Sequence, residues 1–189
     1  MGDNSIFPFS DQVFTILKEL KSTNGNVFFD QIIGHFHDIS GADFTYIGSV
    51  DHIKNTVTTI TGLAGRDKME NFSYSLKDTP CNVVKYNETC FYPDDKLLID
   101  MGIEAYVGTP LIDSESNVIG IIVALFKFKE NHVQHIAELF DLFSGRIAVE
   151  LERINKAEEL ILKKKEKADQ EHYFKNITDK LPEIGRAHV

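Results

Sequence analysis

The chain has 189 residues, of which 42% are hydrophobic, enough to bury the core of one ordinary domain with an appendage. Its formal net charge of −9 argues against a nucleic-acid partner, because no excess of Lys and Arg is present to replace phosphate counterions. No apolar run approaches the ~20 residues of a membrane span, and residues 1–10 lack the pattern of a secretion signal. We therefore expect a soluble, cytoplasmic segment with no membrane insertion, any anchor of the full-length protein lying outside it.

Two amphipathic helices are predicted at the start of the chain. The first spans Phe7–Lys21, with Ser10 or Asp11 as its cap. Its apolar face is formed by Val13, Leu17 and Leu20. The second is capped by Asn26 and ends at Gly41. Its apolar residues are Val27, Phe28, Ile32, Ile33 and Phe36.

Antiparallel strands are predicted next. Phe44–Val50 alternates apolar and polar residues, as a half-buried strand does. Asn55–Leu63 is rich in Thr, Val and Ile and is predicted to be its antiparallel partner. The strand pattern is lost over Gly62–Glu70 and returns briefly at Phe72–Leu76.

Short elements are predicted between residues 79 and 102. Thr79–Val84 has the pattern of a helix start, with Thr79 as cap and Pro80 at the first helical position. Glu88–Tyr92 is compatible with a short strand. Asp94–Gly102 indicates a short helix with acidic residues at its positive end and Gly at its exit.

A β-hairpin is predicted from two apolar runs, 102–112 and Val118–Phe126, which flank the polar segment Asp113–Asn117. The second run is apolar almost without interruption, which is typical of a strand that is covered on both faces. We therefore expect this hairpin at the centre of a sheet.

A long helix is predicted from Asn131, which caps it, to about Asp169. At ~1.5 Å per residue it would extend roughly 55 Å, more than one small domain can cover. Beyond Leu151 only a narrow apolar stripe remains between charged residues. A coiled-coil partner would stabilise such a helix, so a parallel homodimer is predicted, with a solitary frayed helix as the alternative.

Several motifs, in this order along the chain, resemble those of a GAF domain. They are Phe72–Leu76 leading into 78–84, Cys90–Pro93 with the acidic helix after it, Gly102–Leu111, Val118–Gly120 and Ala148–Arg153. The matching features run from about Val27 to Arg153 and are most similar to GAF modules of bacterial sensor proteins.

The resemblance implies an α+β, PAS-like GAF fold, in which a central antiparallel β-sheet is flanked by helices and followed by a long C-terminal linker helix. It divides the chain into an N-terminal helix (1–25), a GAF domain (26–155) and a signalling or coiled-coil linker helix (156–172). Residues 173–189 resemble the truncated start of a PAS domain, so the chain is expected to be part of a longer sensor.

The function implied by this resemblance is signal transduction. The segment itself is not expected to be an enzyme. It would bind a small molecule or sense an intracellular signal and relay it through a dimeric helix. The receiver would be a downstream PAS and output domain of the same chain, such as the histidine kinase of a two-component system or a nucleotide cyclase. The alternative is a dimerisation spacer that binds no ligand.

Cys81 and Cys90 are the only cysteines, and their separation matches no metal or redox motif. Near the start of its predicted helix, Cys81 would feel the positive end of the helix dipole, which favours the thiolate. A packed structural thiol, a redox sensor and a covalent bilin site of the phytochrome kind stay open. However, Asn82 stands where His commonly follows a bilin cysteine. A thiol enzyme resembling free methionine sulfoxide reductase is a further alternative, although such GAF enzymes usually carry three cysteines.

Other cofactors lack a motif here. The Asn-Lys-Phe-Asp motif of cyclic-nucleotide-binding GAF domains does not occur, and no His lies in an identifiable haem pocket. The histidines considered are His35, His37 and His52. No combination of His and carboxylates forms a metal or hydrolase signature, so no metal ligand or catalytic residue is predicted and the cofactor stays unknown.

A ligand pocket, where present, is placed by the resemblance between the sheet and the inserted segments Thr79–Val84 and Asp94–Met101. The candidates for its walls are Tyr46, Thr58, Tyr74, Cys81, Phe91, Tyr106 and Thr109. The alternative is that these side chains fill the core and leave no cavity larger than a water molecule.

Overall fold

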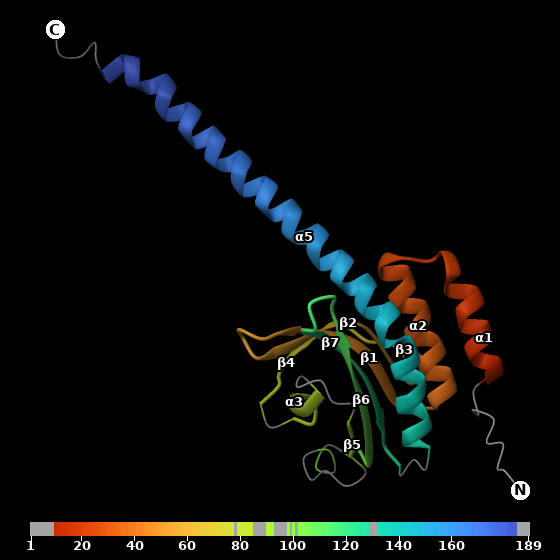
Figure 1. Cartoon of the computed structure of the whole chain (residues 1–189). Coiled ribbons are helices and arrows are strands. Elements are labelled where there is room, and N and C mark those ends of the chain that lie inside the picture. The colour runs from red at the N-terminus through yellow and green to blue at the C-terminus, as the bar shows by residue number, and fades with distance from the viewer. Residues whose placement is uncertain are drawn as a thin grey trace, which may run out of the picture. The chain divides into compact units, whose positions relative to one another are not determined.

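A computed structural model describes residues 10–77, 79–84, 90–92, 98, 100, 102–128 and 132–184. The chain divides into two compact units, Met1–Glu152 and Arg153–Val189. The first unit holds an antiparallel β-sheet with helices on both faces (Figure 1). The second consists, over its described part, of a single helix.

The sheet of the first unit has the strand order β3-β2-β1-β7-β6-β5, with β4 paired to β2. Its strands are β1 (Phe44–Asp51), β2 (Thr56–Ala64), β3 (Asp67–Lys68), β4 (Ser73–Ser75), β5 (Cys90–Tyr92), β6 (Ala105–Ile112) and β7 (Val118–Phe126). The predicted hairpin is confirmed as β6 and β7, and β7 lies between β1 and β6. Residues 120–124 of β7 are all buried, as the near-continuous apolar run predicted.

The hairpin loop is closed by its first residue. The carboxylate of Asp113 accepts hydrogen bonds from the backbone N–H groups of Glu115 at 2.9 Å and Asn117 at 2.8 Å. An Asp side chain that bonds the backbone ahead of it in this way is typical of a tight turn.

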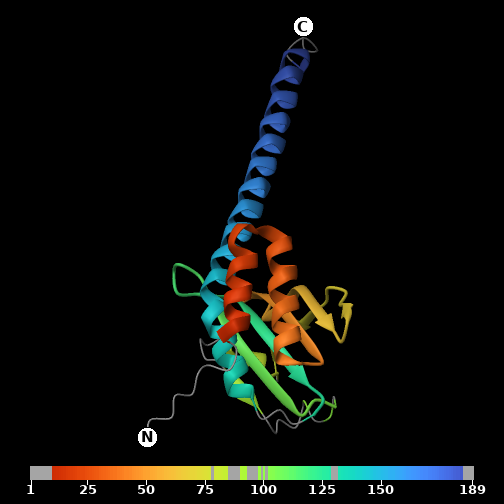
Figure 2. The same cartoon turned by 90° about the vertical axis from the view of Figure 1, so that its right-hand side faces the viewer.

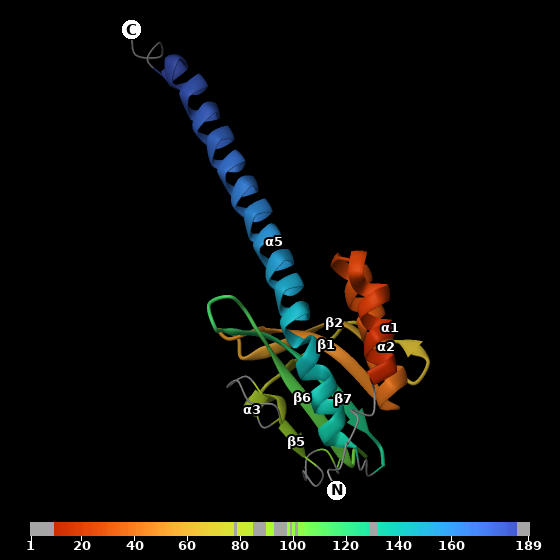
Figure 3. The ribbon, with the colours of Figure 1, turned by 45° about the vertical axis from the view of Figure 1, so that its right-hand side comes forward.

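Three helices lie on one face of the sheet, namely α1 (Ser10–Glu19), α2 (Gly25–Ser40) and the first part of α5 (Val133–Ile184) (Figure 3). Helix α2 packs against β1 and β2, and α1 lies on its outer side (Figure 2). The ring of Phe36 on α2 lies 4.7 Å from that of Phe140 and 5.8 Å from that of Phe143, centroid to centroid. The core of this helix layer is therefore aromatic.

The first two helices differ from the sequence prediction in detail. In α1 the buried side chains are Ile16 and, just beyond its end, Leu20, whereas Leu17 is 55% exposed. The error arises because α1 packs on its neighbour along one narrow i, i+4 stripe rather than along the whole apolar face. Helix α2 begins at Gly25, not after Asn26, and Val27 is exposed.

On the opposite face of the sheet lies α3 (Cys81–Val84) (Figure 1). The hydroxyl of Thr79, the predicted cap of this helix, donates a hydrogen bond to the carbonyl of Leu76 at 2.8 Å. The predicted strands at 72–76 and 88–92 are confirmed over Ser73–Ser75, which is β4, and over Cys90–Tyr92, which is β5. Most of the helix predicted over 94–102 lies outside the described residues.

Helix α5 has 52 residues and continues to Ile184, so the predicted end near Asp169 was wrong. No Gly or Pro occurs between Arg153 and Leu181 to interrupt it. The helix crosses much of the segment that resembles the start of a PAS domain, and that domain stays a prediction. In the described part of the chain no helix combines the length and apolar composition that a bilayer span requires.

Candidate functional site

A cavity of about 470 Å³ lies on the face of the sheet that carries α3. Strands β1, β4, β6 and β7 and the start of α3 contribute to its walls. The described residues that line it are Phe44, Tyr46, Met69, Phe72, Tyr74, Ser75, Thr79, Pro80, Cys81, Leu98, Ile103, Tyr106 and Leu125. None of these carries a charge at neutral pH, and most are aromatic or aliphatic.

Three tyrosines reach the cavity from three different strands. Tyr46 on β1 pairs with Val123, and Tyr106 on β6 pairs with Leu125, so both point to the same face of the sheet as those β7 residues. Tyr74 on β4 reaches the same side. Pairings between strands that are distant in sequence therefore bring the three hydroxyl groups together.

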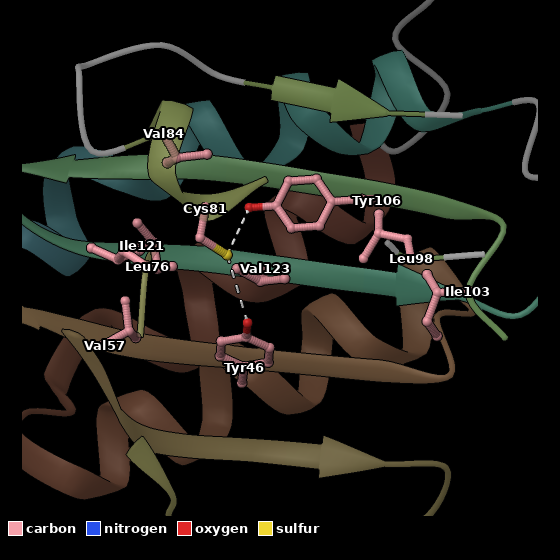
Figure 4. Close-up of a cluster of buried hydrophobic side chains, with 10 residues drawn as sticks. All are labelled: Tyr46, Val57, Leu76, Cys81, Val84, Leu98, Ile103, Tyr106, Ile121 and Val123. Carbon is pink, nitrogen blue, oxygen red and sulfur yellow. Dashed lines mark hydrogen bonds between the residues drawn. The ribbon is translucent and has the colours of Figure 1, made fainter. Parts of the chain in front are cut away.

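The hydroxyl groups converge on the sulfur of Cys81. Tyr74 and Tyr106 each donate a hydrogen bond to Cys81 Sγ at 3.2 Å. The hydroxyl of Tyr46 lies 2.8 Å from that of Tyr74 and 3.9 Å from the sulfur. Figure 4 shows Tyr46 and Tyr106 approaching Cys81 from opposite sides. The described wall of the cavity thus has one polar end, made of a thiol and three phenols.

Gly108 allows Tyr106 to adopt this position. The two residues lie two apart on β6 and so share a face of the sheet. A Cβ atom at position 108 would overlap the hydroxyl and the ring of Tyr106. The ring can therefore lie along the strand toward Cys81 only because residue 108 has no side chain.

The thiol of Cys81 is held in its neutral form. Burial raises its pKa above the ordinary value of 9.0, and hydrogen bonds from Tyr106, Tyr74 and Tyr46 only partly oppose this effect. The field of a four-residue helix, which by itself favours the thiolate, does not offset desolvation, and the packed structural thiol is the alternative that agrees with this environment. Burial also raises the pKa values of Tyr46 and Tyr74.

Of the seven predicted wall residues, Tyr46, Tyr74, Cys81 and Tyr106 line the cavity. Thr58 does not, because it alternates with the buried Val57 and its hydroxyl lies 2.7 Å from that of Ser73 at the exposed side. Thr109 pairs with Ile122, which places it on the face of β6 that carries α2 and α5, opposite the cavity. For Phe91 the structure describes only the backbone, which pairs with Val107.

Sequence reasoning missed several aromatic and apolar wall residues. They are Phe44, Met69, Phe72, Ile103 and Leu125. Phe44 could have been found, because it lies two residues before Tyr46 on the same strand face. Phe72 could have been found in the same way, because it lies two residues before Tyr74 in the predicted strand Phe72–Leu76. No comparable local signal marks Met69, which is brought to the cavity by the chain path after β2.

The histidines considered for haem have other partners. His35 Nε2 lies 3.0 Å from a carboxylate oxygen of Glu19, and His52 donates to the carbonyl of Val118 at 2.6 Å. His37 Nδ1 lies 3.1 Å from the hydroxyl of Thr45. Within the described residues, no cluster of three or more His, Cys, Asp or Glu could hold a metal ion.

Replacing Thr109 with Val is expected to raise the free energy of unfolding by about 1 kcal/mol. The Thr109 hydroxyl oxygen is buried without a hydrogen-bond partner among the described residues, and Val removes it while keeping the shape. Urea denaturation measures the change. Thr58→Val, at the exposed and hydrogen-bonded position, serves as control and should give no such gain. If Thr109→Val were less stable than the wild type, the Thr109 hydroxyl would not be an unsatisfied buried group.

Raising the pH above about 9 is expected to destabilise the domain. The pKa values of Cys81, Tyr46 and Tyr74 are higher in the folded than in the unfolded state, so the unfolded state loses these protons first. The contribution of these groups to the free energy of unfolding is complete below their ordinary pKa values, which are those of the unfolded chain. It falls as the pH rises from these values through the higher pKa values of the folded state, by up to about 1.4 kcal/mol per pH unit for each group. Urea midpoints from about pH 8 to about pH 10.5 test this.

Tyr74→Phe is the matched variant for the pH experiment. It keeps the ring and removes one titrating hydroxyl, so its stability should fall less steeply with pH than that of the wild type. Parallel profiles for the two proteins would show that Tyr74 does not titrate with folding.

Comparison with known proteins identifies one family. The family model for the GAF domain matches residues 17–151. Among curated proteins, no sequence matches the chain significantly.

Solved structures give the same result at the level of the fold. The GAF domain of an Acinetobacter phosphoenolpyruvate-protein phosphotransferase superposes with a TM-score of 0.67 at 13% identity, over 79% of this chain and 96% of that one. The A. aeolicus nlh2 GAF domain in an inactive state superposes with a TM-score of 0.58 at 11% identity, over 77% of this chain and 95% of that one. The chromophore-binding domain of Stigmatella aurantiaca phytochrome P1 superposes with a TM-score of 0.57 at 14% identity, over 76% of this chain and 62% of that one. The α+β fold with a central antiparallel sheet is therefore confirmed.

Proposed function

This chain belongs to the GAF domain family, and from that premise we propose that it is a regulatory sensor module. In this proposal a small molecule binds in the cavity beside Cys81, and its occupancy is relayed through α5. Homologues of the family serve as sensory or regulatory modules, and one similar structure is named as the chromophore-binding domain of a phytochrome. A bilin is not part of the proposal, because Asn82 follows Cys81.

The observation that carries this proposal is the cavity itself. A volume of about 470 Å³ falls within the ~300–1,000 Å³ range of small-molecule sites, whereas a fully packed core leaves voids no larger than a water molecule. This favours a ligand-binding module over a dimerisation spacer that binds nothing.

The relay would run through the central hairpin. On β7, Ile121 and Val123 belong to the hydrophobic cluster around Cys81, while Gly120 meets α5 on the other face. A Cβ atom on Gly120 would lie only 2.8 Å from Cδ2 of Leu151. Binding that shifts this hairpin would change how α5 packs on it, and a ligand does so only through its difference in affinity for the two packings.

Beyond Arg153 the helix would transmit the change as a parallel homodimer. Large apolar side chains are exposed along this part of α5, which a partner helix would cover. They are Leu160, Ile161, Leu162, Tyr173, Phe174 and Ile177. The output is a downstream domain of the same chain, a PAS domain followed by a kinase or a cyclase.

Native mass spectrometry of the purified protein tests the proposal. We expect a bound small molecule that is lost in Leu125→Trp, which fills the cavity from β7, and retained in Phe128→Trp, whose position is 76% exposed and does not line it. Thermal shifts with panels of metabolites extend the search. Repeated failure in both experiments would favour the ligand-free spacer, and sedimentation of a monomer at tens of micromolar would overturn the dimer.

A further inference from the structure

We infer that the ligand of this cavity is an uncharged, flat aromatic molecule with a single oxygen that accepts hydrogen bonds from Tyr74 and Tyr106. The inference rests on the proposed function and names the chemical class of ligand for the same site. Three properties of the cavity support it, namely its aromatic walls, the lack of charge on its described lining, and the weak acceptor at its polar end.

The walls are suited to a flat ring. The rings of Tyr46, Phe72 and Tyr74 form a cluster, with centroids 6.1 Å apart for Tyr46 and Phe72 and 5.8 Å apart for Phe72 and Tyr74. The Phe72 ring belongs to the cavity wall and yet Phe72 is 41% exposed. A planar aromatic ligand would cover this surface and add stacked or edge-to-face contacts.

The lining disfavours a charged ligand. No Asp, Glu, Lys, Arg or His is present among the described residues that line the cavity. A carboxylate or a phosphate moved from water against these described residues would find no opposite charge among them, and burying a charge without such a partner is strongly unfavourable. The described ion pair between Lys68 and Asp30 lines a different cavity, on the α2 side of the sheet.

The polar end offers hydroxyl donors that bond a weak acceptor. Tyr74 and Tyr106 both donate to the sulfur of Cys81, and a thiol sulfur is a weak acceptor. A carbonyl oxygen on the ligand is a stronger acceptor. The hydroxyl groups could turn toward it in exchange for their weak hydrogen bonds to the sulfur, and this exchange favours binding.

Three naphthalene derivatives that differ in one substituent test the inference by calorimetry and saturation-transfer NMR. 2-Acetylnaphthalene is neutral and has the oxygen, 2-naphthoate has nearly the same shape with a charge, and 2-ethylnaphthalene lacks the oxygen. We expect 2-acetylnaphthalene to bind about tenfold more tightly than either of the others, the ratio that one good hydrogen bond provides. The double variant Tyr74→Phe/Tyr106→Phe should bind the acetyl and ethyl compounds equally.

Every other result contradicts one part of the inference or of the proposed function. Equal binding of the acetyl and ethyl compounds to the wild type removes the role of the oxygen. Binding of 2-naphthoate as tight as that of 2-acetylnaphthalene overturns the uncharged class and leaves the sensor proposal standing. When no probe binds but native mass spectrometry finds another molecule in the cavity, only the ligand class fails. When neither probes nor a co-purified molecule bind, the proposed function fails as well.

Discussion

Replacing Phe36 with Ala is expected to lower the free energy of unfolding by about 4 kcal/mol. Phe36 is fully buried on α2, and its ring packs against those of Phe140 and Phe143 on α5. Truncation removes the apolar contact area and both aromatic contacts, and it leaves a cavity that the packed helices refill only partly. Equilibrium urea denaturation measures the loss.

Phe14→Ala is the matched control for this experiment. It makes the same chemical change on α1, where Phe14 is 74% exposed, and should alter stability by no more than about 0.5 kcal/mol. A loss below about 1 kcal/mol at Phe36 would show that α2 and α5 do not pack around this ring. Because Phe36 lies on the face of the sheet opposite the cavity, the affinity for a cavity ligand should change less than the stability does.

The hairpin could be predicted from the sequence because its information is local. The apolar run Val118–Phe126 and the polar loop before it specify a covered strand and a turn within about twenty residues. The end of α5 could not be placed in the same way. Beyond Asp169 the apolar spacing weakens, but no Gly or Pro interrupts the helix before Pro182. The helix propensity of these residues therefore extends α5 beyond the end that the apolar periodicity indicated.

The candidate site was only partly predictable because it depends on pairings between distant strands. Tyr46 and Tyr106 were found as residues, but their meeting at Cys81 requires β7 to lie between β1 and β6. Thr109 was assigned to the wrong face, although counting from Tyr106 in steps of two would have excluded it. For the thiol, the local helix signal was outweighed by burial, which only the fold reveals.

Replacing Glu150 with Ala is expected to lower the free energy of unfolding by about 3 kcal/mol. Glu150 is only 2% exposed on α5, and its carboxylate accepts a hydrogen bond from the backbone N–H of Gly25, the first residue of α2. This places a negative charge at the positive end of α2, which explains why that helix starts there without a side-chain bond from Asn24. Removing the carboxylate leaves a partly buried N–H without this acceptor.

Arg146, one turn earlier on α5, makes contacts beside this carboxylate. Its guanidinium donates to the carbonyl of Thr23 at 3.3 Å, stacks 4.9 Å from the centre of the Phe28 ring, and lies 3.9 Å from the second oxygen of Glu150. The two α5 residues therefore hold the corner between α1 and α2 at the point where α5 approaches the end of the first unit. Loss of Glu150 should loosen this corner as well as weaken the domain.

Two further variants and hydrogen exchange separate capping from simple packing. Glu150→Gln keeps the size and an acceptor oxygen but loses the charge, so it should cost about 1–2 kcal/mol, less than Ala. Glu138→Ala, at an exposed position of the same helix, should change stability by less than about 0.5 kcal/mol. In Glu150→Ala the amides in the first turn of α2, from Gly25 to Phe28, should exchange faster than those at its centre. Unchanged exchange there, with a full loss of stability, would mean that Glu150 acts by filling space, because a cap protects the helix end that it bonds.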